Sequence, residues 1–135
     1  YLRELRGGER TASEGVLDAG VRRFCSRFSE ATGIRVDVVT SGPPVRNDRL
    51  AAEVFQMVAE GLSNVRRHSS AGRCEVRIEV AEDRLRLTVT NDGAGPGTPD
   101  FHPRSLGERA AALGGTARVE HPRPGETAVC VDIPL

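Results

Sequence analysis

The longest uninterrupted helical pattern in the chain spans residues 50–68, and it constrains the fold more than any other stretch. Apolar residues recur there at spacings of three and four, which is the period of an amphipathic α-helix. They are Val54, Val58, Gly61, Leu62 and Val65. A helix with such a stripe buries that face against another layer of structure. We therefore expect a long helix that is packed on one side.

The polar side of this helix carries an acid, an amide, a cation and an imidazole. These are Glu60, Asn64, Arg67 and His68, which share one face because a helix turns by about 100° per residue. A solvated face has little reason to place Asn in mid-helix, where the side chain competes with the backbone. Spacing alone leaves two interpretations open, an ordinary polar face and a functional cluster.

The side chains of this cluster suit a metal ion and phosphate. The oxygen of Asn64 is a hard ligand of the kind that Mg²⁺ takes alongside water and phosphate. Arg67 and His68 can hold phosphate oxygens. Glu60 can accept a proton, or orient a hydroxyl group or a water molecule.

Strict alternation of apolar and polar residues predicts the strands of a sheet. The alternating stretches are residues 34–38, 73–80, 85–90, 116–120 and 127–133. Two of them are separated only by the polar turn AEDR, which predicts an antiparallel hairpin. Further helices are expected from Ser13 to about Thr32, where Gly33 ends the helix, and over residues 105–113. The order of elements predicts an α+β fold with a mostly antiparallel sheet covered on one face by helices.

Composition narrows the function classes. The 135 residues suffice for one domain. Lys plus Arg and Asp plus Glu both number 19, and this balance argues against a nucleic-acid binder, which normally has a basic excess. Cys25, Cys74 and Cys130 lack the spacing of metal ligands, so we expect buried thiols rather than a disulfide framework or a zinc site. No apolar run approaches the ~18 residues of a membrane helix.

Three further motifs have ordinary interpretations when each is taken alone. NDGAGPG, residues 91–97, opens a loop directly after a strand, where glycines let the backbone approach a ligand or adopt positive φ. SLGERAAALGG, residues 105–115, fits a capped surface helix, and Gly125 to Thr127 fits a hairpin turn. Neither a Rossmann nor a phosphate-loop signature is present.

In this order, the motifs resemble the ATP-binding domain of the GHKL superfamily, which includes gyrase, Hsp90, histidine kinases and MutL. The similarity is greatest to sensor histidine kinases of the nitrate-sensor and DesK-like type. EGLSNVRRHSSA, residues 60–71, resembles the N box, E-x-x-x-N-x-x-[RK]-H, and NDGAG resembles the G1 box, D-x-G-x-G. ERAAALGG resembles the helix after the ATP lid, and GETAVCVDIPL the final strand. The resemblance covers residues 13–135 and implies a two-layer α/β sandwich of the Bergerat type.

The resemblance implies an ATP and Mg²⁺ site between the 50–68 helix and the loop at 91–104. Asn64 would ligate Mg²⁺, and Arg67 and His68 would face the phosphates. Glu60 would lie near the transferred phosphoryl group and assist the acceptor. Catalysis would consist of positioning and charge neutralisation of an in-line phosphoryl transfer.

The same resemblance implies an adenine pocket at the Gly-rich motif. Gly93 and Gly95 would let the backbone pass the nucleotide, and Thr127 would support the pocket. Asn91 stands where the family has an adenine-reading Asp. An amide replaces that carboxylate as acceptor when its oxygen faces the ligand, without the charge-assisted strength. Phe101 to Arg104, FHPR, stand where the family's lid carries glycines, and their proline and bulky side chains would stiffen the lid.

By resemblance, the phospho-acceptor histidine belongs to a dimerising domain that precedes this one. Residues 1–12 would be the remnant of its last helix and a linker, and residues 13–135 the kinase domain. The expected partners are ATP, that acceptor domain, a response regulator and a second copy of the full-length protein. The domain would be cytoplasmic, and membrane anchoring of its parent stays open. Two alternatives remain: a degenerate, non-catalytic docking module, and a serine kinase of the anti-sigma-factor type.

Overall fold

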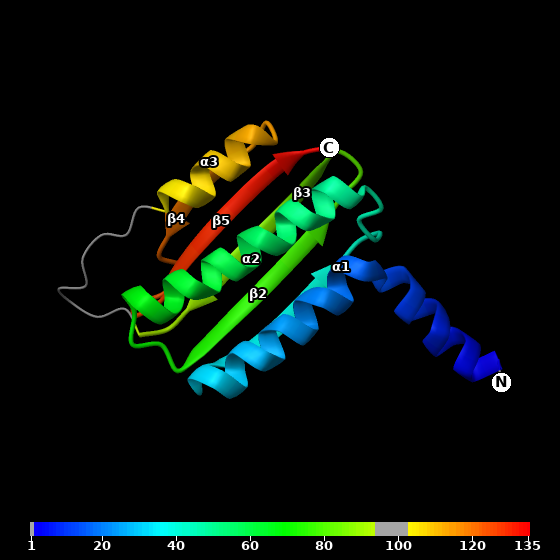
Figure 1. Ribbon diagram of the computed structural model, residues 1–135, viewed down its shortest axis with the longest axis horizontal. Helices are drawn as coiled ribbons and strands as arrows, with labels where there is room; N and C mark the ends of the chain where they lie inside the picture. Colours follow the sequence, from blue (N-terminus) through cyan, green and yellow to red (C-terminus); the bar gives the residue numbers. More distant parts are fainter. Residues whose placement is uncertain (1, 94–102) are drawn as a thin grey trace.

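The computed structural model describes residues 2–93 and 103–135, with side chains from residue 15 onward in these ranges. In this part of the chain, three helices and five strands form two layers, and the helices lie on one face of the sheet (Figure 1). The elements are α1 (Leu2–Thr32), β1 (Arg35–Ser41), α2 (Asp48–His68), β2 (Arg73–Val80), β3 (Arg84–Asn91), α3 (Arg104–Ala112), β4 (Thr116–Glu120) and β5 (Thr127–Pro134).

The sheet is mixed, with the strand order β1-β2-β3-β5-β4. β1 and β2 are parallel, while the β2–β3, β3–β5 and β4–β5 pairs are antiparallel. Parallel neighbours need a long crossover connection, and α2 supplies it between β1 and β2. These findings confirm the α+β class and the mostly antiparallel sheet covered on one face by helices.

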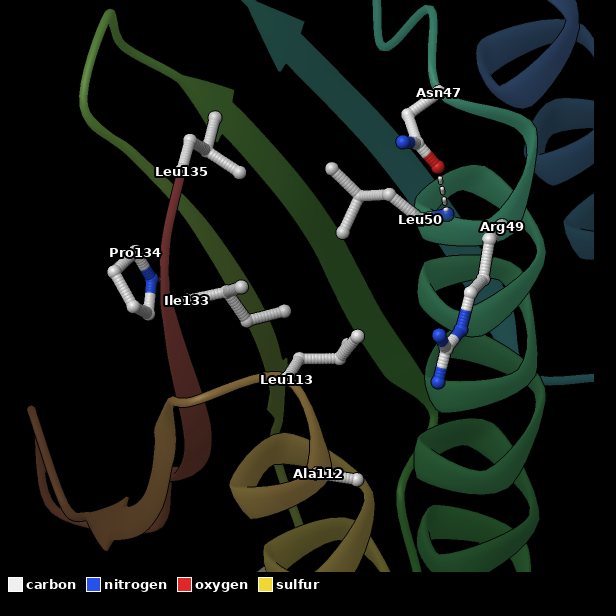
Figure 2. A pocket seen from close by; sticks show the side chains of 8 residues that line it. All are labelled: Asn47, Arg49, Leu50, Ala112, Leu113, Ile133, Pro134 and Leu135. Carbon is white, nitrogen blue, oxygen red and sulfur yellow. Dashed lines mark hydrogen bonds between the residues drawn. The ribbon is translucent and has the colours of Figure 1, made fainter.

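The long central helix α2 begins two residues earlier than the apolar pattern predicts, because Asn47 caps it. The Asn47 side-chain oxygen accepts a hydrogen bond of 2.9 Å from the Leu50 backbone nitrogen (Figure 2). Such a bond satisfies one of the free N–H groups of the first turn. The predicted apolar stripe is buried, with Met57 added to it. Gly61 lets α2 approach β3, since a Cβ at this position would lie 3.1 Å from Val89 Cγ2.

The core lies between α1, α2, α3 and one face of the sheet. The alternating strand residues that face the helices are almost fully buried: Cys74, Val76, Ile78, Leu85, Leu87, Val89, Val131 and Ile133. The three cysteines are buried free thiols, as predicted. Burial raises the pKa of the Cys25 thiol to about 11 and that of Cys74 to about 12. Both thiols are therefore protonated and act as small apolar groups.

The opposite face of the sheet carries a chain of paired charges across β3, β5 and β4. Asp132 accepts hydrogen bonds from Arg86 Nε at 2.7 Å and from Arg118 Nη1 at 2.6 Å. Arg118 Nε also donates to Glu120 at 2.7 Å. These pairs neutralise one another on the face that the helices leave uncovered.

The first helix begins earlier than the sequence pattern predicts. Helical residues extend from Leu2 to Thr32, so the helix does not begin at Ser13. The break lies at Gly15 instead, where φ is 74° and ψ is −175°, a conformation that is essentially restricted to glycine. The segment before Gly15 departs from the domain at an angle (Figure 1). The predicted stop at Gly33 is confirmed, with φ at 79°.

None of the helices in the described ranges is long and apolar enough to span a membrane.

Candidate functional site

Most of the side chains proposed from sequence gather at one end of the sheet. Glu60, Asn64, Arg67 and His68 follow the C-terminal half of α2. Asn91 ends β3 and Thr127 begins β5, and the two residues are direct partners across the strands. α2 packs on β3 beside them, with Gly61 against Val89. The fold therefore brings the N-box helix and the strand ends of the G1 box and the last hairpin together.

Asn64 and Arg67 already interact on the surface of α2. Arg67 Nη2 donates to Asn64 Oδ1 at 3.2 Å, which is the geometry expected for helix residues three apart. Asn64 is half-buried, whereas Arg67 and His68 are exposed. The amide oxygen of Asn64 is therefore engaged by the guanidinium of an exposed arginine.

Glu60 is held by a residue that sequence reasoning did not single out. Arg109 of α3 donates from Nε to Glu60 Oε2 at 3.2 Å, and from Nη1 to Glu53 Oε1 at 3.3 Å. All three side chains are between one quarter and two fifths exposed. The available signals were the Arg of ERAAALGG and the spacing of seven between Glu53 and Glu60, which places both acids on one face of α2.

Asn91 is the only buried polar side chain among the described residues, at 7% exposure. Its Nδ2 donates to the backbone oxygen of Asp92 at 2.6 Å. This bond fixes which end of the amide faces Asp92, and the oxygen at the other end is the only hydrogen-bond acceptor of the side chain. This is the orientation that an amide needs in order to replace an adenine-reading carboxylate.

Asp92 and Gly93 fasten the end of β3 to the loop that follows α2. Asp92 Oδ1 accepts from the backbone nitrogens of Gly72 at 2.8 Å and Arg73 at 3.0 Å. Gly93 has φ at 91°, and a Cβ there would lie 2.7 Å from the Ala71 nitrogen. Close packing within the chain therefore requires glycine at this position, whether or not a nucleotide passes it. Gly95, Phe101 and His102 lie outside the described residues.

A separate shallow pocket of about 220 Å³ lies at the other end of α2. Figure 2 shows its lining, which comes from the start of α2, the end of α3 and the C-terminal residues of β5. Its only charged side chain is Arg49, and none of the residues proposed from sequence lines it. We therefore place the candidate site at the opposite end, around Asn64 and Asn91.

The donor set of that site fits a metal held mainly by substrate and water. In the described ranges, no group of three or more His, Cys, Asp or Glu side chains is arranged to bind a metal ion. Mg²⁺ needs no such cage, since one or two protein oxygens suffice when phosphates and water complete its shell. The half-buried amide of Asn64 can supply one of them.

Comparison with known families agrees with this arrangement. The histidine kinase-, DNA gyrase B- and HSP90-like ATPase family matches residues 50–135, which include α2 from its third residue onward and every element after it. The chain belongs to this ATPase family. Membership implies that this domain binds ATP. The match also agrees with the predicted two-layer α/β sandwich of the Bergerat type.

Individual relatives indicate which kind of protein within this ATPase family the chain resembles. The sensor histidine kinase NarS of Mycobacterium tuberculosis is 33% identical, over 88% of this chain and 29% of NarS. The nitrate/nitrite sensor protein NarX of Escherichia coli is 30% identical, over 88% of this chain and 21% of NarX. The histidine kinase domain of a blue-light activated kinase from Erythrobacter litoralis has a TM-score of 0.69 at 25% identity, over 88% of this chain and 61% of that one.

These relatives confirm the resemblance drawn from the motifs. The ATPase-family domain is the ATP-binding catalytic domain of a sensor histidine kinase. It spans less than a third of the length of NarS and of NarX.

Proposed function

We propose that this domain, with Mg²⁺, transfers the γ-phosphoryl group of ATP to a histidine on a phospho-acceptor domain of the same protein. The phosphorylated histidine would then pass the group to a response regulator. The observation that carries the proposal is the pairing of two unlike surfaces at one end of the sheet. Glu60, Asn64 and Arg67 offer charged and hard polar groups along α2. Asn91 and Thr127 offer neutral, largely buried groups at the adjoining strand ends. Phosphates suit the first surface and a nucleobase the second.

At the phosphate end, Asn64 and Arg67 would exchange partners when the nucleotide binds. Mg²⁺, when bound, supplies positive charge to the phosphate oxygens. The Asn64 oxygen must be released by Arg67, which contacts it at 3.2 Å, before it can ligate a metal. The freed guanidinium can then bind phosphate, which replaces a bond to a neutral amide with a stronger bond to an anion. His68, at the end of α2, lies beside it on the same face.

At the adenine end, Asn91 would select the base. Its oxygen can accept a hydrogen bond from the exocyclic amine of adenine, and the bond from its nitrogen to the Asp92 carbonyl holds the amide in one orientation. Guanine carries a carbonyl at the corresponding position and offers no donor there. Thr127, directly opposite Asn91, would close the same side of the pocket.

Glu60 would assist the acceptor. Its carboxylate can accept a hydrogen bond from the protonated ring nitrogen of the acceptor histidine, which orients the other, unprotonated nitrogen toward the γ-phosphorus. It can take up that proton as the new N–P bond forms and ADP leaves. The remaining contribution of the domain is electrostatic, since phosphoryl transfer depends mainly on position and on neutralised charge.

Calorimetric titration of the domain with ATP, with and without Mg²⁺, tests the proposal. We expect Asn64→Ala to abolish the gain in affinity that Mg²⁺ gives. Arg67→Ala should weaken ATP binding by about tenfold or more, because a hydrogen bond to a charged group is lost. Arg66→Ala is the matched control: Arg66 is a neighbouring exposed arginine in the last turn of α2, and its loss should leave the affinity nearly unchanged.

The alternatives predict other results. A folded domain that binds no ATP at millimolar concentration would contradict the proposal and favour a docking module. Phosphate appearing on a protein serine, with none on histidine, would favour the anti-sigma-factor type of kinase.

We also propose that the segment before Gly15 leads from the acceptor domain, with residues 1–12 as the remnant of its last helix and a linker. The homodimeric state of the full-length protein, its response regulator and the cytoplasmic location of this domain follow from the same proposal.

A further inference from the structure

The contact between Arg109 and two acids of α2 joins the proposed catalytic residue to a different helix. Arg109 Nε lies 3.2 Å from Glu60 Oε2, and Nη1 lies 3.3 Å from Glu53 Oε1. The two acids are seven residues apart, or about two helical turns. One guanidinium therefore spans the face of α2 on which Glu60 precedes Asn64 by one turn.

The base of the Arg109 side chain is fixed by packing. Its neighbour Ala110 is fully buried and Leu106 is 2% exposed, so α3 cannot rotate without disturbing the core. A guanidinium is planar and presents its N–H groups in a rigid fork. Because Nη1 of Arg109 contacts Glu53, the planar guanidinium directs its Nε–H group toward Glu60.

An ordinary surface ion pair would contribute little here, since exposed pairs add about 0–1 kcal/mol to stability. Two features distinguish this contact. Glu60 is the least exposed of the three, with 25% of its side chain accessible. It also lies one turn before Asn64, on the side where a γ-phosphoryl group would be.

We propose that Arg109 is the positioning residue for Glu60: it holds the carboxylate in the orientation that serves the acceptor histidine, and Glu53 holds Arg109 in turn. The inference rests on the proposed function of Glu60 and adds the residues that support it. Arg109 itself does not need to touch ATP. Its loss should therefore slow the chemical step and leave nucleotide binding nearly intact.

Autophosphorylation of the full-length protein, followed with radiolabelled ATP, separates these effects. We expect Arg109→Gln to lower the maximal rate by about 10- to 100-fold while the KM for ATP changes by less than about threefold, as for a misplaced catalytic group. Arg109→Lys, which keeps the charge but not the fork, should recover part of the rate. Glu53→Gln is the matched control, because it removes the second arm only and should cost less than Arg109→Gln.

Combining the variants identifies the partner. If Arg109 acts through Glu60, then Arg109→Gln should cause no further loss of rate in a Glu60→Gln background. An equal loss in both backgrounds, or a raised KM at unchanged maximal rate, would overturn the inference. Wild-type rate in Glu60→Gln would instead show that the proposed function of Glu60 is wrong.

A second measurement does not depend on activity. The NMR signal of the Arg109 Nε–H group in the isolated domain reports its hydrogen bond directly. We expect Glu60→Gln to shift this signal and to speed its exchange with water, and Glu53→Gln to affect it less, since Glu53 contacts Nη1. An Nε–H signal that is unchanged in Glu60→Gln would refute the positioning contact.

Discussion

At the scale of single residues, the candidate site is defined by which atoms are already engaged. Asn91 uses its nitrogen on a neighbouring carbonyl and thereby presents an oxygen. Asn64 has its oxygen occupied by Arg67. The two amides have the same chemistry, but under the proposed function the first already presents its oxygen to adenine, whereas the second would have to exchange partners before it could ligate a metal. Sequence alone gives the residue types, and only the contacts distinguish these states.

The engaged amide of Asn91 leads to a prediction on base selectivity. Asn91→Ala should weaken ATP binding by about five- to tenfold, the value of one hydrogen bond, and leave GTP binding unchanged. Competition between the two nucleotides for a fluorescent analogue measures the ratio. Thr90→Ala, one residue earlier and on the opposite face of β3, is the control. Equal losses for both nucleotides would mean that Asn91 supports the fold and does not select the base.

At the scale of elements, the sequence predicts those helices and strands whose position follows from a local pattern of apolar and polar residues. The stripe of α2 and the β2–β3 hairpin were predicted, because spacings of two or of three and four residues decide them. The stop at Gly33 was predicted because glycine favours the left-handed conformation that ends a helix. The sequence placed the start of the first helix at Ser13, whereas the break in α1 lies at Gly15. Both a cap residue and a glycine can mark the start of a segment, and the pattern did not distinguish them. The contact of Arg109 with Glu60 was missed because it joins residues 49 positions apart, which no local pattern encodes.

The break at Gly15 predicts opposite effects for two glycines of the same helix. Gly15→Ala should destabilise the domain by about 1–3 kcal/mol, because φ of 74° with ψ of −175° is unfavourable for any side chain. The added Cβ would also lie 3.1 Å from Pro44 Cβ. Urea unfolding followed by circular dichroism measures the change.

Gly20 supplies the matched control for that experiment. It is helical, and a Cβ there would make an ordinary contact of 3.7 Å with the Phe55 ring. Gly20→Ala should therefore stabilise the domain by about 0.5–1 kcal/mol. If Gly15→Ala were as stable as wild type, the break in α1 would not be an intrinsic property of the domain.

At the scale of the whole molecule, stability depends on a sheet with two unlike faces. One face is buried under helices, while the other relies on charges that pair across β3, β5 and β4. The parallel β1–β2 pair completes the sheet and connects the first strand to the rest. A mostly antiparallel sheet was expected, but the partner of β1 was not predicted, because strand pairing depends on which distant segments meet.

The charged face predicts a pH dependence of stability. Partial burial disfavours ionised Asp132, but hydrogen bonds from Arg86 and Arg118 outweigh this and hold the pKa of Asp132 below its usual value. A carboxyl with a lowered pKa in the folded state stabilises the fold above its unfolded pKa. That stability is lost as the pH falls through the folded pKa. As the pH falls from above the usual pKa of an aspartate toward the lowered pKa of Asp132, wild type should therefore lose stability more steeply than Asp132→Asn.

Urea unfolding at several pH values tests this expectation. Asp37→Asn is the control, since Asp37 is about half exposed and its pair with Arg35 is longer, at 3.6 Å. Parallel curves for wild type and Asp132→Asn would contradict a stabilising role of the charge chain in acid.

One helix, α2, carries both the packing stripe and the proposed phosphate-binding side chains. In genetic terms, inherited substitutions along residues 48–68 would cause two classes of defect. The positions of each class would recur with the helical period, but on different faces of α2. Changes at Val58 or Leu62 would reduce the amount of protein in the cell. Changes at Asn64 or Arg67 would leave the amount intact and silence its signal, and such proteins could still occupy a partner and suppress a functional copy.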